Sequence, residues 1–267
     1  MKILSVLTSA AVASSLAFTL AGQASATTFK FDWEKADGTN LGKSEVDGKA
    51  QKLWVNHGVG SYDSINTTFN DVTDEFTFSA DFTNKGNAID GGWVVISDGP
   101  NPKKHDKEFA ILYLDAVNDR VTAYAYNGQN NANSFRTNEL LGSWEGIMNY
   151  ENEDGKSSFN FSIDATEINA RTDIGNNWKG LTFGEQVGIW FHAGRNTNVT
   201  YDSNTGDVTS FSSQAKWYDT IALDTEVVPE AVPEPTALLG LGLVSGAFAV
   251  SRRRKDGSIA TEGADLA

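Results

Sequence analysis

The chain has 267 residues, a formal net charge of −14 and no cysteine. Its acidity argues against nucleic acid and anionic lipid as partners, because both are polyanions. The absence of cysteine excludes disulfides and thiolate metal sites, so stability must come from an ordinary core or an oxygen-ligated ion. The 15 Phe, 7 Trp and 7 Tyr supply apolar surface for such a core.

The first 26 residues have the pattern of a secretory signal. Lys2 supplies a positive start, residues 3–20 form an apolar, small-residue stretch, and Ala24-Ser25-Ala26 matches an A-x-A cleavage site. This pattern predicts an N-terminal signal helix that signal peptidase removes, with Ala24 and Ala26 as the residues it recognises. We therefore expect an exported protein whose mature chain begins near Thr27.

Residues 27–226 are predicted to form one all-β domain. Short runs of alternating apolar and polar residues are separated by Gly, Asn and Asp clusters, which is typical of strands joined by turns. Residues 165–178 are expected to contain one helical turn. Strands at this spacing predict an antiparallel β-sandwich, a jelly roll of the concanavalin or laminin-G type. The expected strands are residues 28–33, 51–55, 75–82, 92–97, 109–115, 120–126, 158–164, 186–192 and 216–223.

Aromatic residues in two of these strands are candidates for binding sugar. Alternation places Tyr124 and Tyr126 on one face of their strand, opposite small alanines, and Trp93 lies in another strand. Rigid, amphipathic rings of this kind stack on the faces of sugars, so an extracellular polysaccharide is a possible partner. The alternative is that these rings belong to the core.

A polar segment near the end of the domain is a candidate calcium site. Asp202, Asn204 and Asp207 offer oxygen atoms around Gly206, which suits a hard cation. The alternative is a plain hairpin turn, because Asn, Asp and Gly favour turn conformations. A possible structural calcium is the one cofactor that the residues suggest.

Enzymatic patterns are absent from the sequence. A retaining glycosidase needs two carboxyl groups about 5–5.5 Å apart, and the chain has no E-x-D-x-E pattern of the kind laminarinase-like jelly rolls use. Glu151, Glu153 and Asp154 lie together, but we expect them in a solvated turn. His57, His105 and His192 have no second ligand at metal-binding spacing, and no G-x-S-x-G motif occurs. We expect a protein that is not an enzyme, with a glycoside hydrolase as the weakest alternative.

The C-terminal region has the order of a sorting signal. An acidic, proline-containing linker at residues 227–232 leads to a Pro-Glu-Pro motif, an apolar run at residues 236–250 and a basic cluster. As a helix, the 15-residue run would cover about 22 Å of the roughly 30 Å hydrocarbon core. The motif is Pro233, Glu234 and Pro235, and the basic cluster is Arg252, Arg253, Arg254 and Lys255.

This order resembles the PEP-CTERM proteins, which are substrates of exosortases. The resemblance implies that residues 233–255 are a sorting and transmembrane segment, and that residues 256–267 are a short cytoplasmic tail. It also implies a transient anchor in the inner membrane, cleavage by an exosortase near Pro-Glu-Pro, and then release or attachment at the cell surface.

A second resemblance covers much of the domain. Residues 92–103 (GWVVISDGPNPK), 110–113 (AILY) and 122–128 (TAYAYNG) are similar to the XDD-type exosortase-dependent surface proteins of cyanobacteria. Residues 216–223 (KWYDTIAL) are similar to the closing strand of concanavalin-like jelly rolls, which implies a second candidate calcium ligand at Asp219. This resemblance implies a sandwich and carries over no activity. With the missing catalytic patterns, we expect a non-enzymatic surface or extracellular-matrix protein, with a carbohydrate-binding module as the alternative.

Overall fold

The computed structural model describes residues 26–34, 43–46, 49–52, 59–99, 105–128, 133–137, 139–214 and 221–229. The predicted signal helix and the predicted C-terminal transmembrane helix both lie outside these residues. Within them, no helix has the length and apolar character needed to cross a membrane.

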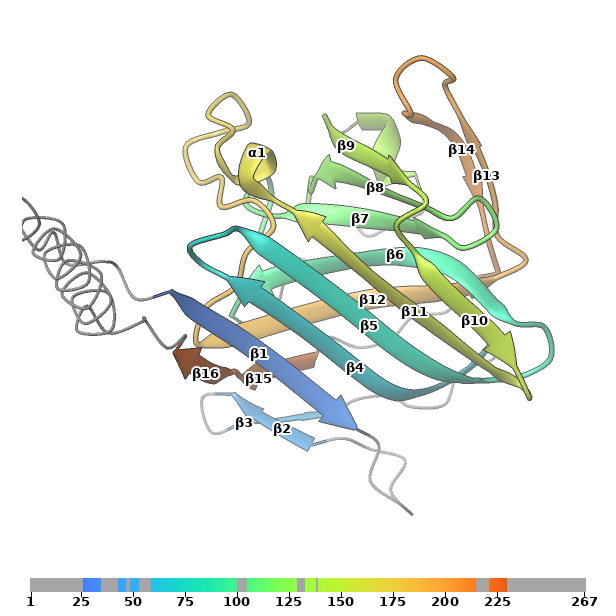
Figure 1. Cartoon of the computed structure of the whole chain (residues 1–267), viewed down its shortest axis with the longest axis horizontal. Coiled ribbons are helices and arrows are strands. Elements are labelled where there is room, and N and C mark those ends of the chain that lie inside the picture. Colours follow the sequence, from blue (N-terminus) through green and yellow to red (C-terminus); the bar gives the residue numbers. More distant parts are fainter. Residues whose placement is uncertain are drawn as a thin grey trace, which may run out of the picture.

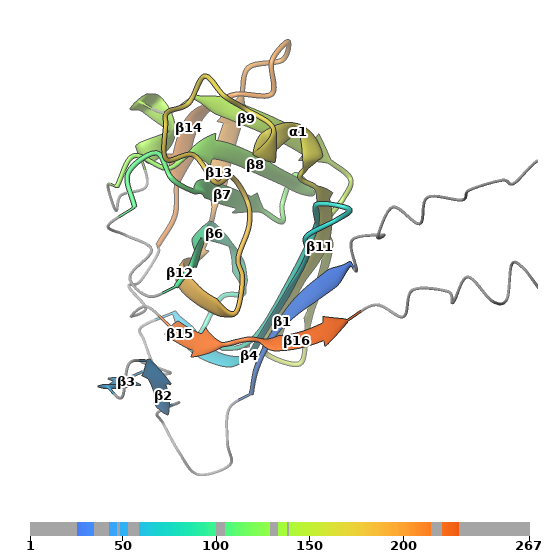
Figure 2. The same cartoon turned by 90° about the vertical axis from the view of Figure 1, so that its left-hand side faces the viewer.

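The described chain is all-β, with two six-stranded antiparallel sheets stacked as the layers of a sandwich (Figures 1 and 2). This confirms the predicted all-β antiparallel fold. The first sheet has the order β10 (Asn149–Glu153), β11 (Lys156–Asp164), β5 (Glu75–Asn84), β4 (Gly60–Asn70), β1 (Thr27–Glu34) and β16 (Glu226–Pro229). The second has the order β15 (Ile221–Asp224), β12 (Gln186–Arg195), β6 (Ile89–Asp98), β7 (Ala110–Asp115), β8 (Arg120–Ala125) and β9 (Leu140–Glu145).

Six smaller elements complete the described fold. The hairpin of β13 (Asn198–Tyr201) and β14 (Val208–Ser212) lies on the second sheet, and β2 (Lys43–Val46) pairs with β3 (Lys49–Lys52). One 3₁₀ turn, η2, spans Ser134–Thr137. The single α-helical turn, α1 (Thr166–Asn169), lies within the segment where the sequence predicted one.

Phenylalanines fill the space between the two sheets. Period-2 alternation in β5 and β11 turns Phe78, Phe82 and Phe161 inward, while the alternate positions of each strand face outward. Phe191 of β12 crosses the gap and meets Phe78 and Phe82 edge-on, with ring centroids 5.7 Å apart in both pairs. Such edge-on contacts add about 0.5–1.5 kcal/mol each beyond the burial of area, so they tie the layers together.

Strand β4 was not predicted, and a β-bulge explains why. Its pairing with β5 shifts register between Tyr62 and Ser64, so the strand register skips Asp63. Tyr62 and Ile65 are both buried although they lie three residues apart, which breaks the alternation that identifies a strand.

The predicted linker at residues 227–232 is corrected in part. Val227, Val228 and Pro229 belong to β16, which pairs with the first residues of β1 in the register Thr27↔Pro229. Backbone pairing at the edge of a sheet does not require buried side chains, and all four residues of β16 are exposed. The domain therefore extends to Pro229, and its first and last strands lie side by side (Figure 2).

Candidate functional site

The outer face of the first sheet is polar. Because Phe78 and its neighbours point inward, the intervening positions of β5 and β11 point outward, and these are hydroxyl, amide and charged residues. Cross-strand pairs therefore join polar side chains in rows across the sheet. Three such pairs are Ser162–Thr77, Asn160–Ser79 and Ser158–Asp81.

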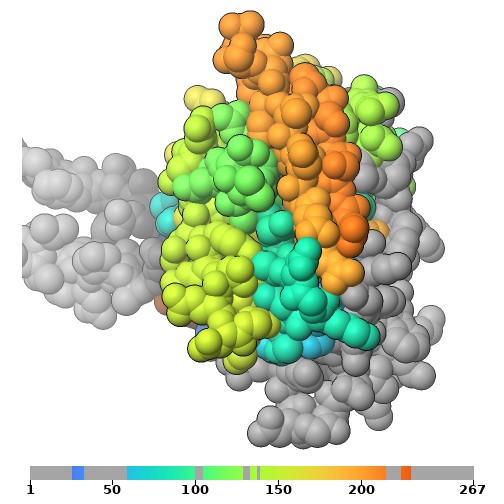
Figure 3. Space-filling view, turned by 90° about the vertical axis from the view of Figure 1, so that its right-hand side faces the viewer, coloured from blue at the N-terminus to red at the C-terminus, as the bar shows by residue number. Residues whose placement is uncertain are grey.

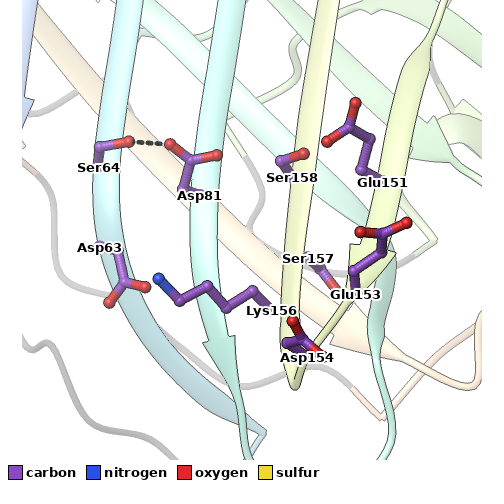
Figure 4. Close-up of a pocket in the computed structure, with 9 residues that line it drawn as sticks. All are labelled: Asp63, Ser64, Asp81, Glu151, Glu153, Asp154, Lys156, Ser157 and Ser158. Atoms are coloured by element: carbon purple, nitrogen blue, oxygen red, sulfur yellow. Dashed lines mark hydrogen bonds between the residues drawn. The ribbon is translucent and has the colours of Figure 1, made fainter.

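A groove of about 600 Å³ is hollowed into this face near the β10–β11 turn (Figure 4). Small serines alternate with longer charged side chains, which leaves space above the sheet. Strands β4, β5, β10 and β11 all contribute. The lining residues are Asp63, Ser64, Asp81, Glu151, Glu153, Asp154, Lys156, Ser157 and Ser158.

Hydrogen bonds fix two of the groove carboxylates. The Ser64 hydroxyl donates to Oδ2 of Asp81, and the Thr83 hydroxyl donates to Oδ2 of Asp63 at 2.7 Å. Asp63 owes its position to the β4 bulge, and the Lys156 side chain extends across β5 toward it (Figure 4).

The groove is strongly negative. Its lining holds five carboxylates and one ammonium, a net charge of −4 at neutral pH. Ionised carboxylates accept short, charge-assisted hydrogen bonds, so the arrangement suits a ligand rich in hydroxyl or amino groups. Within the described chain, no group of three or more His, Asp or Glu side chains is placed to hold a metal ion.

The sequence indicated part of this groove. Asp154 and Gly155 form the expected turn, with φ of 51° and 74°. Glu151 and Glu153, however, lie on β10, facing outward beside β11. The expectation that all three carboxylates belong to a turn is thus wrong for two of them.

The predicted sugar-binding rings are corrected by their burial. Tyr124 and Tyr126 are 0% exposed and Trp93 is 5% exposed, so their faces cannot stack on a sugar. The β13–β14 hairpin covers this side of the second sheet with Val199, Val208 and Phe211, forming a second core. Figure 3 shows the hairpin (orange) rising above the neighbouring segments. The three rings therefore belong to a core, which was the alternative interpretation of the sequence.

Tyrosine hydroxyls fasten the hairpin to the sheet. The Tyr124 hydroxyl donates to Oδ1 of Asp207 and accepts from the Val208 amide at 2.7 Å. The Tyr201 hydroxyl donates to Oδ2 of Asp115 at 2.9 Å. Burial, followed by the hydrogen bond to Asp207, raises the pKa of Tyr124 well above its ordinary value.

The candidate calcium ligands are used by the hairpin itself. Oδ1 of Asp202 accepts from the backbone amides of Asn204 and Thr205 at 2.9 and 3.0 Å, and these bonds lower the pKa of the Asp202 carboxyl. The Asp207 side chain bonds Tyr124. The hairpin-turn alternative thus describes the segment, and calcium binding there is not supported. Asp219 lies outside the described residues.

Two of the three histidines are described, and each has aromatic or acidic neighbours. His192 stacks on Trp93 at 4.7 Å and meets Trp190 edge-on at 4.8 Å, inside the second core. His105 contacts Glu108.

The predicted processing residues are mostly outside the described chain. Ala26 immediately precedes β1, whereas Ala24 and the whole predicted C-terminal sorting signal lie beyond the described ranges. The chain matches no protein-family model, no curated protein and no solved structure.

Proposed function

We propose that the chain is an exported, exosortase-processed cell-surface or extracellular-matrix protein. Its β-sandwich, a jelly roll of the concanavalin or laminin-G type, is the non-enzymatic part that is delivered. Signal peptidase and an exosortase are its processing partners, and the inner membrane is its transient anchor.

One observation carries this proposal. The sandwich begins at Thr27, one residue after the A-x-A motif, and its last described strand ends at Pro229, four residues before Pro233. Both expected cleavage sites therefore fall just outside the folded domain, so both segments can be removed without breaking a strand. Since Thr27 pairs with Pro229, the two ends of the described domain meet at the same place on the sheet edge.

The acidic groove and the end of β16, where the C-terminal tail begins, lie at opposite ends of the first sheet's strands, which supports attachment to a surface through the tail. Along β1, Thr28 pairs with Asn70, and six residues later Glu34 pairs with Ser64 of the groove. At about 3.3 Å per residue, the groove is about 20 Å along the sheet from the edge where the tail departs. Attachment through the tail would hold the groove away from the anchoring surface.

Sequencing both ends of extracellular material tests the proposal. We expect a first residue of Thr27 and the absence of Arg252–Lys255, with processing lost when Pro233 and Pro235 are both replaced by alanine. Extracellular protein that begins at Met1, or that keeps the basic cluster, would contradict it.

A second candidate function is polysaccharide binding in the acidic groove. The groove volume of about 600 Å³ lies within the range of small-ligand sites. Sugar hydroxyls can donate to its carboxylates, and the net charge of −4 favours polymers that carry amino groups.

Co-sedimentation with insoluble polysaccharides tests this candidate. We expect an amino-sugar polymer to bind better than a neutral glucan, and Glu151→Gln with Glu153→Gln to weaken binding at least several-fold. Glu167→Gln on α1 is the matched control, because it removes a carboxylate elsewhere on the surface. Equal binding by all variants would rule the groove out, and release of reducing sugar would favour the glycoside hydrolase instead.

A further inference from the structure

The backbone amide and the backbone carbonyl of Thr27 both form hydrogen bonds with Asp71. The Thr27 amide donates to Oδ1 of Asp71 at 2.8 Å, and the Thr27 carbonyl accepts from the Asp71 amide at 3.1 Å. Asp71 opens the turn between β4 and β5, directly after the β4 strand that pairs with β1. The first residue of the sandwich is therefore fixed to a carboxylate.

Cleavage after Ala26 would change the donor in this contact. When water hydrolyses the Ala26–Thr27 bond, its hydroxyl goes to the Ala26 carbonyl carbon and its hydrogen to the Thr27 nitrogen. The free amine, with an ordinary pKa of about 7.7–8.0, takes up a proton in neutral water. An amide with one hydrogen becomes an ammonium with three hydrogens and a positive charge.

We propose that Asp71 is a built-in receptor for the new N-terminus, so that signal cleavage turns a neutral hydrogen bond into an ion pair. A charge-assisted bond is shorter and stronger than a neutral one. Within the described chain, no Lys or Arg side chain forms an ion pair with Asp71, and Lys30 of β1 pairs with Asp32 at 3.1 Å instead.

An ion pair at Thr27 would also stabilise β16, the edge strand that leads to the C-terminal tail. Thr27 pairs with Pro229 on one side and lies next to the β1–β4 pairs on the other, so fastening Thr27 also fastens the end of β16. Processing at one end of the chain would thus stabilise the place where the other processed segment begins. This inference rests on the proposed export, in that it needs cleavage after Ala26.

A double-mutant cycle on the purified chain tests the ion pair. One form begins at Thr27, released from an N-terminal fusion, and the other keeps Ala24–Ala26, which puts its ammonium about 10 Å further along the chain. Both forms run to Ala267 in the same detergent. Asp71→Asn is made in each, because the amide keeps one acceptor oxygen for the Thr27 nitrogen and removes the negative charge.

We expect Asp71→Asn to lower Tm by about 1–4 °C more in the form that begins at Thr27, the size of one exposed ion pair. The difference should shrink in about 1 M salt, where the Debye length is about 3 Å. Asp154→Asn, in the distant β10–β11 turn, should affect both forms equally. If Asp71→Asn has the same effect in both forms, the proposal is wrong.

This outcome is independent of the export experiment. Extracellular protein with a different first residue would overturn the proposed processing while leaving the measured coupling intact. Conversely, a zero coupling energy would remove Asp71 as a receptor even if secreted protein begins at Thr27.

Discussion

The hydroxyl of Tyr124 on β8 donates to the carboxylate of Asp207, 83 residues further along the chain. The same hydroxyl accepts from the buried amide of Val208, so one side chain fixes both the loop and the strand of the β13–β14 hairpin. Tyr201 and Asp115 make a second link of this kind. These contacts place the aromatic residues of the second sheet inside a core instead of on a surface.

Tyr124→Phe should loosen the hairpin. The substitution keeps the ring but leaves the Val208 amide without its acceptor, and a buried unpaired donor costs about 1–3 kcal/mol. We expect a loss of that size in urea-induced unfolding and faster hydrogen exchange at Val208. Tyr150→Phe removes a hydroxyl that donates to the Ile89 carbonyl at 3.0 Å, so it is the control that should leave Val208 protected. Unchanged exchange at Val208 in Tyr124→Phe would show that the Tyr124 hydroxyl does not hold the hairpin in place.

Stability should fall above about pH 10. Burial raises the pKa values of Tyr113, Tyr124, Tyr126 and Tyr201 in the folded state, whereas tyrosines of the unfolded chain titrate near 10. Below that pH both states keep the phenol protons. Above it the unfolded state loses protons that the folded state retains, so the free energy of unfolding decreases as pH rises.

Urea unfolding between about pH 8 and about pH 11, followed together with phenolate absorbance, measures this effect. Ionisation of these four tyrosines should coincide with unfolding. Phenolate signals from the buried rings in a still-folded protein would contradict their burial.

The fold was predictable wherever alternation was unbroken. In β5, the buried residues Phe76, Phe78, Ala80 and Phe82 at every second position identify both the strand and its inward face. In β4 the bulge at Asp63 changes the phase of the pattern, so the sequence of the strand looks irregular. In β16 every side chain is exposed, Val227 and Val228 included, so its pairing with Thr27–Lys30 is not marked by alternating buried and exposed residues.

The candidate sites were less predictable than the fold. Both the burial of the tyrosine rings and the assembly of the acidic groove depend on contacts between residues far apart in the sequence. Alternation places Tyr124 and Tyr126 on one face of β8, but it does not tell which face another segment covers. The cover comes from Val199–Phe211, more than 70 residues later. Likewise, the groove combines Asp63, Asp81 and Glu151 from three separate strands, and only the pairing of those strands brings the carboxylates together.

Gly92→Ala should destabilise the second sheet severely. Gly92 has a φ of 153°, and a Cβ built on it would overlap the carbonyl oxygen of His192 on β12. Overpacking in a rigid sheet typically costs about 1–3 kcal/mol, and here the clash is with backbone that cannot rotate away. Gly175→Ala is the control, since a Cβ there meets no atom within 4 Å. Equal Tm values for the two variants would show that β6 can move away from β12.

The distance between β16 and the Pro-Glu-Pro motif should limit processing. Because β16 ends at Pro229, only residues 230–232 separate the sheet edge from Pro233, a reach of about 10 Å at full extension. A protease that binds an extended segment around the motif would collide with the sandwich if this spacing were removed. We expect deletion of residues 230–232 to leave the precursor uncleaved in the membrane fraction. Replacement of the same residues by Gly-Ser-Gly, which keeps the spacing, should allow cleavage. The ratio of precursor to extracellular protein measures both results. Normal cleavage of the deletion variant would mean that β16 peels from β1 during processing, and in that case Asp71→Asn should speed cleavage by weakening the same edge.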